Sequence, residues 1–354
     1  MSDHFAAFSF VDRITLFEPG VRARGEFFVP ADIVAFPSCL VAEAVGQLAA
    51  WVAMEKVAFR GRPVAALAND TTFRGAVRPG DRLELAVEIE QCDDDAVAYA
   101  GSASVAGRCV IELKDCLGPM LPVAEFDAPE ALAGRLALLR GAGATPGRFR
   151  GVVAPALQPG DGMPGESVSA TLTVPAAAPF FGDHFPRRPV FPATLLLDAQ
   201  IQLAMQLAPP GSTPARMTHV KMRSFIAPGQ VLRVEAKRSD AQRIALSAST
   251  DGRTVATALV PAARVVKAFS IYGFENLENA SYPARDAKPA MLFCGDDAQA
   301  KTAVARLITD VGFEPVDVGG LVQALHLEHM TLLWVRMIRA GRQSPSLVWA
   351  ALRR

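Results

Sequence analysis

Residues 180–198 read FFGDHFPRRPVFPATLLLD and contain one histidine, His184, among aromatic residues and prolines. Fourteen residues later, an apolar run carries one acid, Asp198. An imidazole with its ordinary pKa of about 6.5 can take a proton at neutral pH. A carboxyl group in an apolar setting can remain protonated or share a proton through a water, because desolvation raises its pKa. This stretch therefore supplies the two groups of an acid–base reaction. The alternative is that His184 is an exposed turn residue.

The surroundings of this acid occur twice in the chain. FPSCLVAEAVGQLAAW (36–51) and FPATLLLDAQIQLAMQ (191–206) share Phe-Pro, an apolar run, one acid and a glutamine four residues later, at an offset of 155. The Phe-Phe pairs at 27–28 and 180–181 and the Pro-Gly pairs at 79–80 and 228–229 follow the same order. The sequence therefore contains an internal repeat, and Glu43 with Gln47 corresponds to Asp198 with Gln202.

Each repeat predicts the same layout of elements. The acid lies in an apolar stretch of about 16 to 20 residues that opens after a proline, which indicates a helix buried on most of its surface. Alternating segments such as LELAVEIEQ and RIALSAST follow, separated by turn residues, and predict antiparallel strands. We therefore expect an α+β fold in which a sheet wraps a central helix, twice over.

Composition narrows the class of protein. The 354 residues contain 36 Lys plus Arg and 36 Asp plus Glu, so net charge gives no support for binding nucleic acid. The five cysteines contain no CxxC pair and are expected to be reduced. No apolar run approaches the roughly 18 residues of a spanning helix, and the N-terminus lacks a signal-peptide pattern. We expect a cytoplasmic protein without a membrane span.

The segment HFPRRPVFPATLLLDAQIQ resembles the hot-dog β-hydroxyacyl-acyl carrier protein dehydratases nearly position by position. FVDRITLFEPG (10–20), the Pro-x-x-Leu-x-x-Glu-Ala-x-x-Gln of 37–47 and FRGAVRPGD (73–81) are similar to other segments of that family. The resemblance covers about residues 8–262 and implies a double hot-dog. We assign residues 1–125 to the first repeat and 126–263 to the second.

The resemblance also implies how the site is assembled. In this family the histidine loop of one unit faces the central helix of the other, so His184 should pair with Glu43. The first repeat has Val29 or Ala31 where a histidine would stand. Asp198 would then face a vestigial site, with Gln47 and Gln202 as secondary polar groups. A purely structural role for the two acids, in holding the halves together, is the alternative.

Further site residues follow from the same resemblance. The backbone N–H of Ala193, at the start of the second helix, corresponds to the family's donor to the thioester oxygen, and Phe181, Phe185 and Pro192 are expected in the substrate tunnel. Two departures affect this loop. Ala193 and Arg187 stand where the family usually has glycine.

Residues 264–354 change in character. VVKAF, CGDDAQAK, GFEPVDVG and LEHMTLLW resemble the later portion of NADPH-dependent reductases of the deazaflavin-linked type, and their pattern predicts a small α/β segment. The glycine-rich pyrophosphate loop of such domains is absent from the sequence. We therefore expect a piece used for docking a partner enzyme or for homodimerisation, rather than for binding a nucleotide.

The expected activity is dehydration of a 3-hydroxyacyl thioester, in fatty-acid or polyketide-like synthesis. The substrate would be carried by the phosphopantetheine of an acyl carrier protein or by coenzyme A, with no metal and no redox cofactor. Two alternatives are a hot-dog acyl thioesterase and a non-catalytic module that binds a carrier or partner. His326 and His329, spaced as i and i+3, permit metal binding but lack a third ligand type nearby.

Overall fold

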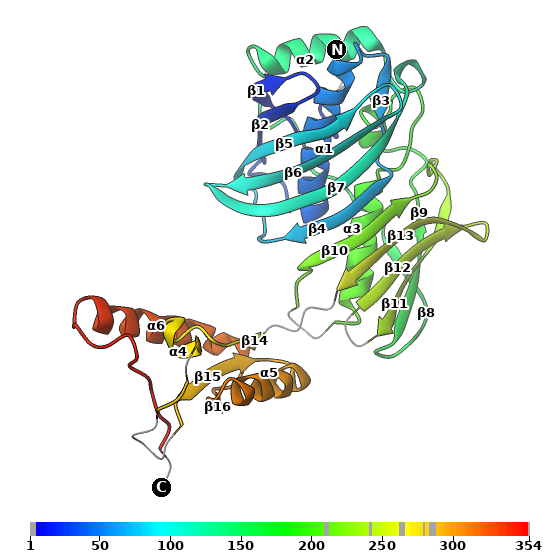
Figure 1. The fold of residues 1–354 in the computed structure, drawn as a ribbon. Helices are drawn as coiled ribbons and strands as arrows, with labels where there is room; N and C mark the ends of the chain where they lie inside the picture. The colour runs from blue at the N-terminus through cyan, green and yellow to red at the C-terminus, as the bar shows by residue number, and fades with distance from the viewer. Residues whose placement is uncertain are drawn as a thin grey trace. The chain divides into compact units, whose positions relative to one another are not determined.

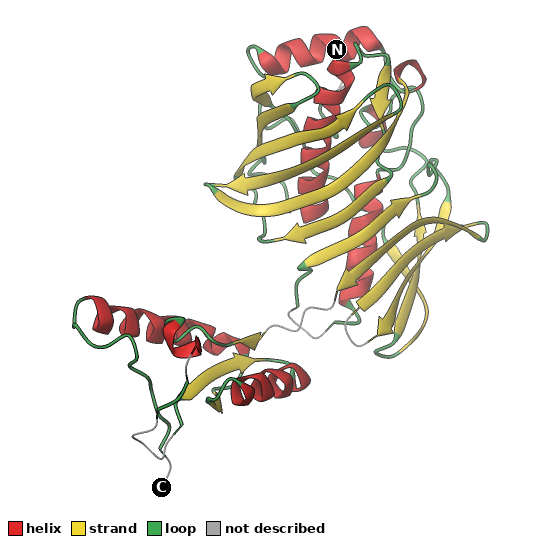
Figure 2. Cartoon of the chain, in the orientation of Figure 1, coloured by secondary structure: helices red, strands yellow, loops and turns green. Residues whose placement is uncertain are grey.

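A computed structural model describes residues 5–208, 212–240, 243–261, 266–278, 280–282 and 288–352. The chain forms two compact units, residues 1–262 and 263–354. Figure 1 traces both units, and Figure 2 shows that the first is built from long strands around helices. No helix among the described residues is both long and apolar enough to cross a membrane.

The first repeat consists of one long helix and the strands that curve around it. The elements are β1 (Arg13–Glu18), β2 (Arg22–Phe28), α1 (Ser38–Lys56), β3 (Gly61–Pro63), β4 (Leu67–Phe73), β5 (Arg82–Cys92), β6 (Ala96–Val105) and β7 (Arg108–Pro122). The helix begins directly after Pro37, whose fixed φ suits the residue before a first turn. It contacts β2, β5 and β6, which explains why its side chains are apolar around most of the circumference.

The second repeat follows the same order of elements, with the short helix η2 (Pro179–Gly182) added before its central helix and, among the described residues, without a counterpart of β3. Its elements are β8 (Leu157–Met163), β9 (Ser167–Thr173), η2, α3 (Ala193–Met205), β10 (Arg216–Met222), β11 (Val231–Asp240), β12 (Arg243–Thr250) and β13 (Arg253–Pro261). The central helix α3 begins directly after Pro192, as α1 does after Pro37. Leu48 on α1 and Leu196 on α3 are fully buried in one hydrophobic core that spans both repeats.

A single 13-stranded sheet joins the two repeats. Its order is β1-β2-β5-β6-β7-β4-β10-β13-β12-β11-β9-β8, with β3 paired to β7. The repeats meet where β4 pairs antiparallel with β10, so that Thr72 lies opposite Arg216. In Figure 1 the sheet passes in front of both central helices, and α1 contacts α3. This is the predicted α+β double hot-dog, and the expected fold class is confirmed.

A connecting segment lies between the repeats. It contains η1 (Val123–Glu125) and α2 (Pro129–Arg140). The predicted boundary assigned residues from 126 onward to the second repeat, but α2 contacts β1 of the first. Leu132, Leu136 and Leu139 recur along one face of α2 and bury that face in the core.

The second unit is a small α/β fold. Its elements are β14 (Val266–Lys267), α4 (Glu275–Glu278), β15 (Ala290–Gly295), α5 (Ala298–Asp310), β16 (Glu314–Asp317), η3 (Leu321–Gln323) and α6 (Ala324–Arg339). The strands β15 and β16 are parallel and α5 connects them, which is a βαβ unit. Phe293, Phe313 and Trp334 belong to its separate core.

Candidate active site

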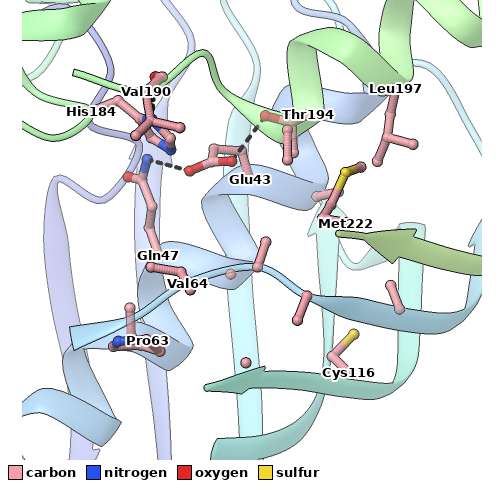
Figure 3. Close-up of a pocket in the computed structure, with 18 of the residues that line it drawn as sticks. Glu43, Gln47, Pro63, Val64, Cys116, His184, Val190, Thr194, Leu197 and Met222 are labelled. Atoms are coloured by element: carbon pink, nitrogen blue, oxygen red, sulfur yellow. Dashed lines mark hydrogen bonds between the residues drawn. The ribbon is translucent and has the colours of Figure 1, made fainter. Parts of the chain in front are cut away.

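A cavity of about 220 Å³ lies where the two repeats meet. Its walls come from α1, the start of α3, β4, β10 and the loop that carries His184. Figure 3 shows side chains from both repeats entering this space. Most of the lining is apolar, and its polar side chains include Cys39, Glu43, Gln47, Arg62, Asp183, His184 and Thr194.

His184 lies on the loop between η2 and α3, and its ring is oriented by the backbone. Nδ1 is 3.0 Å from the carbonyl oxygen of Val190. Because a carbonyl can only accept, Nδ1 is the donor, and Nε2 of the neutral ring is left with its lone pair. The rings of Phe8 and Phe185 flank the imidazole, with centroids 5.4 Å and 4.4 Å away.

Burial lowers the pKa of His184 from its ordinary value of 6.5, because the charged imidazolium is poorly solvated there. The negative charge of Glu43 and the Val190 carbonyl act in the opposite direction, and the positive charge of Arg62 adds to the lowering. The direction favours a neutral imidazole near pH 7. A neutral imidazole with a free Nε2 is the form that acts as a base.

Glu43 lies on α1, and each of its carboxylate oxygens accepts a hydrogen bond. Gln47, one turn later, donates from Nε2 to Oε1 at 3.0 Å, and Thr194 of the second repeat donates from Oγ1 to Oε2 at 2.9 Å. Gln47 is itself fixed, because its Oε1 accepts from the N–H of Phe10 and its Nε2 also donates to the carbonyl of Phe8. Figure 3 shows His184, Glu43 and Gln47 at the same side of the cavity.

Two further buried carboxylates, those of Asp183 and Asp127, stabilise the surroundings of the loop that carries His184. Asp183 accepts hydrogen bonds from the N–H groups of Phe5 and Phe8, which ties the N-terminal segment to the loop. Asp127 pairs with Arg62 at 2.9 Å. The guanidinium of Arg62 also lies 4.5 Å from the centre of the Phe185 ring, next to His184 in the chain.

The counterpart of this site, which combines Asp198 of the second repeat with the Val29 segment of the first, lacks these features. Asp198 accepts a hydrogen bond from Gln202 at 2.7 Å, at the surface, and neither residue lines the cavity. Burial raises the pKa of Asp198, and the Gln202 hydrogen bond opposes the shift. Val29, at the offset of His184, is a fully buried core residue, and Ala31 is exposed. In the part of the chain that the structure describes, this counterpart site therefore has an acid, Asp198, and no histidine at the position that matches His184.

Comparison with known proteins gives the family. A FabA-like domain model matches residues 4–114, and an ApeI dehydratase model matches residues 162–258. The 3-hydroxyacyl-(acyl-carrier-protein) dehydratase FabZ of Bacillus subtilis is 35% identical over 128 residues, which cover 32% of this chain and 91% of that protein. The chain belongs to the 3-hydroxyacyl-acyl carrier protein dehydratase family. The FabZ protein of Chloroflexus aggregans is 37% identical over 120 residues, 31% of this chain and 83% of that protein.

Two further matches lie outside this dehydratase family. An acyl-carrier-protein thioesterase structure from Bacteroides thetaiotaomicron aligns with 68% of this chain and 97% of its own, at 10% identity and a TM-score of 0.44. The metalloreductase STEAP3 of Rattus norvegicus is 36% identical over 74 residues, 21% of this chain and 14% of that protein. The latter match is in line with the reductase resemblance, but it covers too little of that protein to transfer its activity.

The structure sorts the residues that the dehydratase resemblance predicted. His184, Glu43, Gln47, Ala193 and Phe185 all line the one cavity. Phe181 and Pro192, expected in the tunnel, do not line it. The ring of Phe181 lies 4.6 Å from that of Phe180, and both side chains belong to the hydrophobic core. Pro192 is buried ahead of α3, where its backbone sets the start of the helix.

Sequence reasoning missed Thr194 and Arg62. A signal for Thr194 was present, because it directly follows Ala193 and stands at the repeat offset from Cys39. Arg62 carried no comparable signal, since its ion-pair partner is 65 residues away. His326 and His329 are exposed on α6, and the described residues contain no group of three or more His, Cys, Asp or Glu placed to hold a metal ion.

Proposed function

We propose that this protein removes water from a 3-hydroxyacyl thioester on an acyl carrier protein to give a 2-enoyl thioester, in fatty-acid or polyketide-like synthesis. The observation that carries the proposal is that His184 and Glu43, from different repeats, enter one apolar cavity in a chain of the dehydratase family. Both proton transfers fall to these two side chains. The proposed reaction therefore uses no metal and no redox cofactor.

His184 performs the first step in this proposal. Its neutral Nε2 takes a proton from the carbon next to the thioester carbonyl, and the electron pair of that C–H bond moves toward the carbonyl oxygen. The lowered pKa of His184 keeps the base unprotonated near pH 7. The Nδ1 bond to Val190 holds the ring in the required tautomer while it takes the proton.

Glu43 completes the proton balance. The proton removed from the substrate must end on the departing 3-hydroxyl group, which then leaves as water. Both Glu43 oxygens accept hydrogen bonds, one from Gln47 and one from Thr194, and these bonds hold the carboxylate at the cavity. Glu43 takes the proton from the imidazolium and passes it to the 3-hydroxyl group. The electron pair held on the carbonyl oxygen then returns to form the carbon–carbon double bond as the C–O bond breaks and water leaves, so both side chains return to their starting state.

The negative charge that develops on the thioester oxygen requires a donor. Ala193 is the first residue of α3, and the first N–H groups of a helix have no partner within it. Backbone donors at a helix start also lie at the positive end of its dipole. We assign the oxyanion contact to the N–H of Ala193, which lines the cavity beside Thr194.

A product assay tests the proposed function. The purified chain is incubated with a 3-hydroxyacyl thioester of an acyl carrier protein, and the products are separated by mass. We expect loss of one water with the thioester intact, and loss of this activity in His184→Asn. Release of the free acid would indicate a thioesterase, and an unchanged substrate would indicate a binding module.

We further propose that residues 263–354 dock a partner enzyme or a second copy of the chain. The described residues of this unit form one βαβ crossover, and the N–H of Ala300 at the start of α5 donates to the capping side chain of Asp297. The sequence has no glycine-rich pyrophosphate loop. Calorimetric titration with NADPH should show no heat of binding, and tight binding would contradict this proposal.

A further inference from the structure

This inference rests on the proposed function and concerns the side chain of Thr194, which donates a hydrogen bond to the carboxylate of Glu43. Thr194 is the second residue of α3, and its hydroxyl donates to Oε2 of Glu43 at 2.9 Å although 151 residues separate the two. Inside a helix, a threonine hydroxyl commonly bonds the carbonyl four residues earlier. Thr194 lies in the first turn of α3, so the carbonyl four residues earlier is that of Val190, which precedes the helix and accepts from Nδ1 of His184. The Thr194 hydroxyl is thus used across the repeat interface.

Residues 190–194 therefore contain a group that acts on each of the three components of the proposed site. The Val190 carbonyl orients His184, the Ala193 N–H is the proposed oxyanion donor, and the Thr194 hydroxyl holds Glu43. Pro192 fixes the backbone within this segment, with φ at −58°. Figure 3 shows Val190 and Thr194 on either side of the Glu43 carboxylate. One short stretch of chain therefore sets the spacing between base and carboxylate.

The other repeat provides an internal comparison. Cys39 occupies the position in the first repeat that matches Thr194, and it is buried. Burial raises the pKa of its thiol, and the nearby charge of Asp198 adds to this shift. A thiol is a weak donor. Among the described residues, Asp198 is held by Gln202 and no hydrogen bond joins it to Cys39. At this repeat position, a hydroxyl (Thr194) occurs in the second repeat, which also carries His184, and the first repeat has a thiol.

We propose that Thr194 is a positioning residue of the dehydratase site, which holds the Glu43 carboxylate in the orientation that faces His184. Gln47 alone restrains one oxygen and leaves the carboxylate free to rotate about its last bond. Thr194 restrains the second oxygen and ties it to the segment that carries Val190 and Ala193. Loss of the hydroxyl should therefore slow the chemical step and leave substrate binding nearly unchanged.

Two substitutions at this position separate the hydroxyl from the volume of the side chain. Thr194→Val keeps the shape and removes the donor, whereas Thr194→Ser keeps the donor. We expect kcat to fall about tenfold to a hundredfold in T194V, with KM within about twofold, and T194S to stay within about threefold of the wild type. Thr173→Val, on the exposed side of β9, is the control for the same chemical change and should match the wild type.

The split between kcat and KM is the readout that a purely structural role would not move, and the conservative variant T194S should restore kcat while T194V does not. Thermal unfolding within a few degrees of the wild type would show that both variants are folded.

Each outcome has a distinct meaning. If the wild type makes no enoyl product, the proposed function is wrong and this inference with it. If the wild type is active and T194V shares its kcat and KM, the proposed function stands and the role of Thr194 is wrong. If T194S is impaired as severely as T194V, side-chain volume matters and the hydroxyl does not, which also overturns the inference.

Discussion

The two repeats each have a central helix with one acid and a glutamine four residues later, yet the surroundings of these side chains differ. Glu43 and Gln47 lie in a cavity with His184, whereas Asp198 and Gln202 pair at the surface outside it. Among the positions at which the repeats diverge, three concern the groups of the proposed site. These are histidine against valine, threonine against cysteine, and glutamate against aspartate. Duplication of a fold thus does not by itself duplicate a site, which also needs the loop that carries the base.

Among these tests of the difference between the repeats, removal of the base should cause the largest loss of activity. His184→Asn keeps a polar side chain of similar reach but cannot take a proton at neutral pH. We expect kcat/KM to fall about a thousandfold, within the usual range for a general base. The measurement is enoyl-thioester formation at pH 7, with His219→Asn as control, because His219 lies on β10 and does not line the cavity. Activity near the wild-type level in H184N would mean that the two repeats do not differ in the way described.

A second change tests the support behind the histidine loop. Arg62→Met removes the partner of Asp127, whose side chain is only 3% exposed, and leaves a buried carboxylate without its ion pair. We expect the free energy of unfolding to fall by about 3 kcal/mol, measured by urea denaturation. The same change removes a positive charge that lowers the pKa of His184. That pKa should rise, so the acid limb of kcat/KM should move to higher pH.

Two controls complete the Arg62 experiment. Arg62→Lys keeps the charge and should leave the acid limb in place. The double variant with Asp127→Asn should recover part of the lost stability, because it removes the buried negative charge that the Arg62 guanidinium had balanced. A stable R62M protein with an unshifted profile would show that the ion pair does not support the site.

The paired glutamines give a smaller and more finely matched test. Gln47→Ala removes a hydrogen bond to Glu43 and two to the backbone, so we expect kcat to fall about tenfold. Gln202→Ala removes one exposed bond to Asp198 and should leave kcat within about twofold. Steady-state kinetics on both variants decides between them. Equal effects would indicate that both halves contribute to the reaction.

The repeat in the sequence was sufficient to predict the architecture. The spacing of Phe-Pro, acid and glutamine located both central helices, and the alternating segments that follow them became strands of one sheet. These features depend on local pattern, so they can be recognised without knowledge of distant contacts. The pairing of His184 with Glu43 came from the family resemblance, since nothing local connects residues 141 positions apart.

Other features were beyond the sequence for a physical reason. The partners of Thr194 and Arg62 lie 151 and 65 residues away, and a hydroxyl or guanidinium has no pattern that identifies its partner. Phe181 was placed in the tunnel because it adjoins the motif, but the short helix η2 directs it into the core beside Phe180. The position of α2 on β1 likewise depends on packing between segments that are distant in the chain.

The central claim is that Glu43 takes part in the reaction and that Asp198, its counterpart in the other repeat, does not. Its most direct test is the ratio of kcat/KM for Glu43→Gln to that for Asp198→Asn, each measured against the wild type with a 3-hydroxyacyl thioester at pH 7. Both changes remove one ionisable group with almost no change in volume. We predict a loss of at least about a hundredfold in E43Q and less than about threefold in D198N. A loss in D198N as large as that in E43Q, or confined to D198N, would contradict the account.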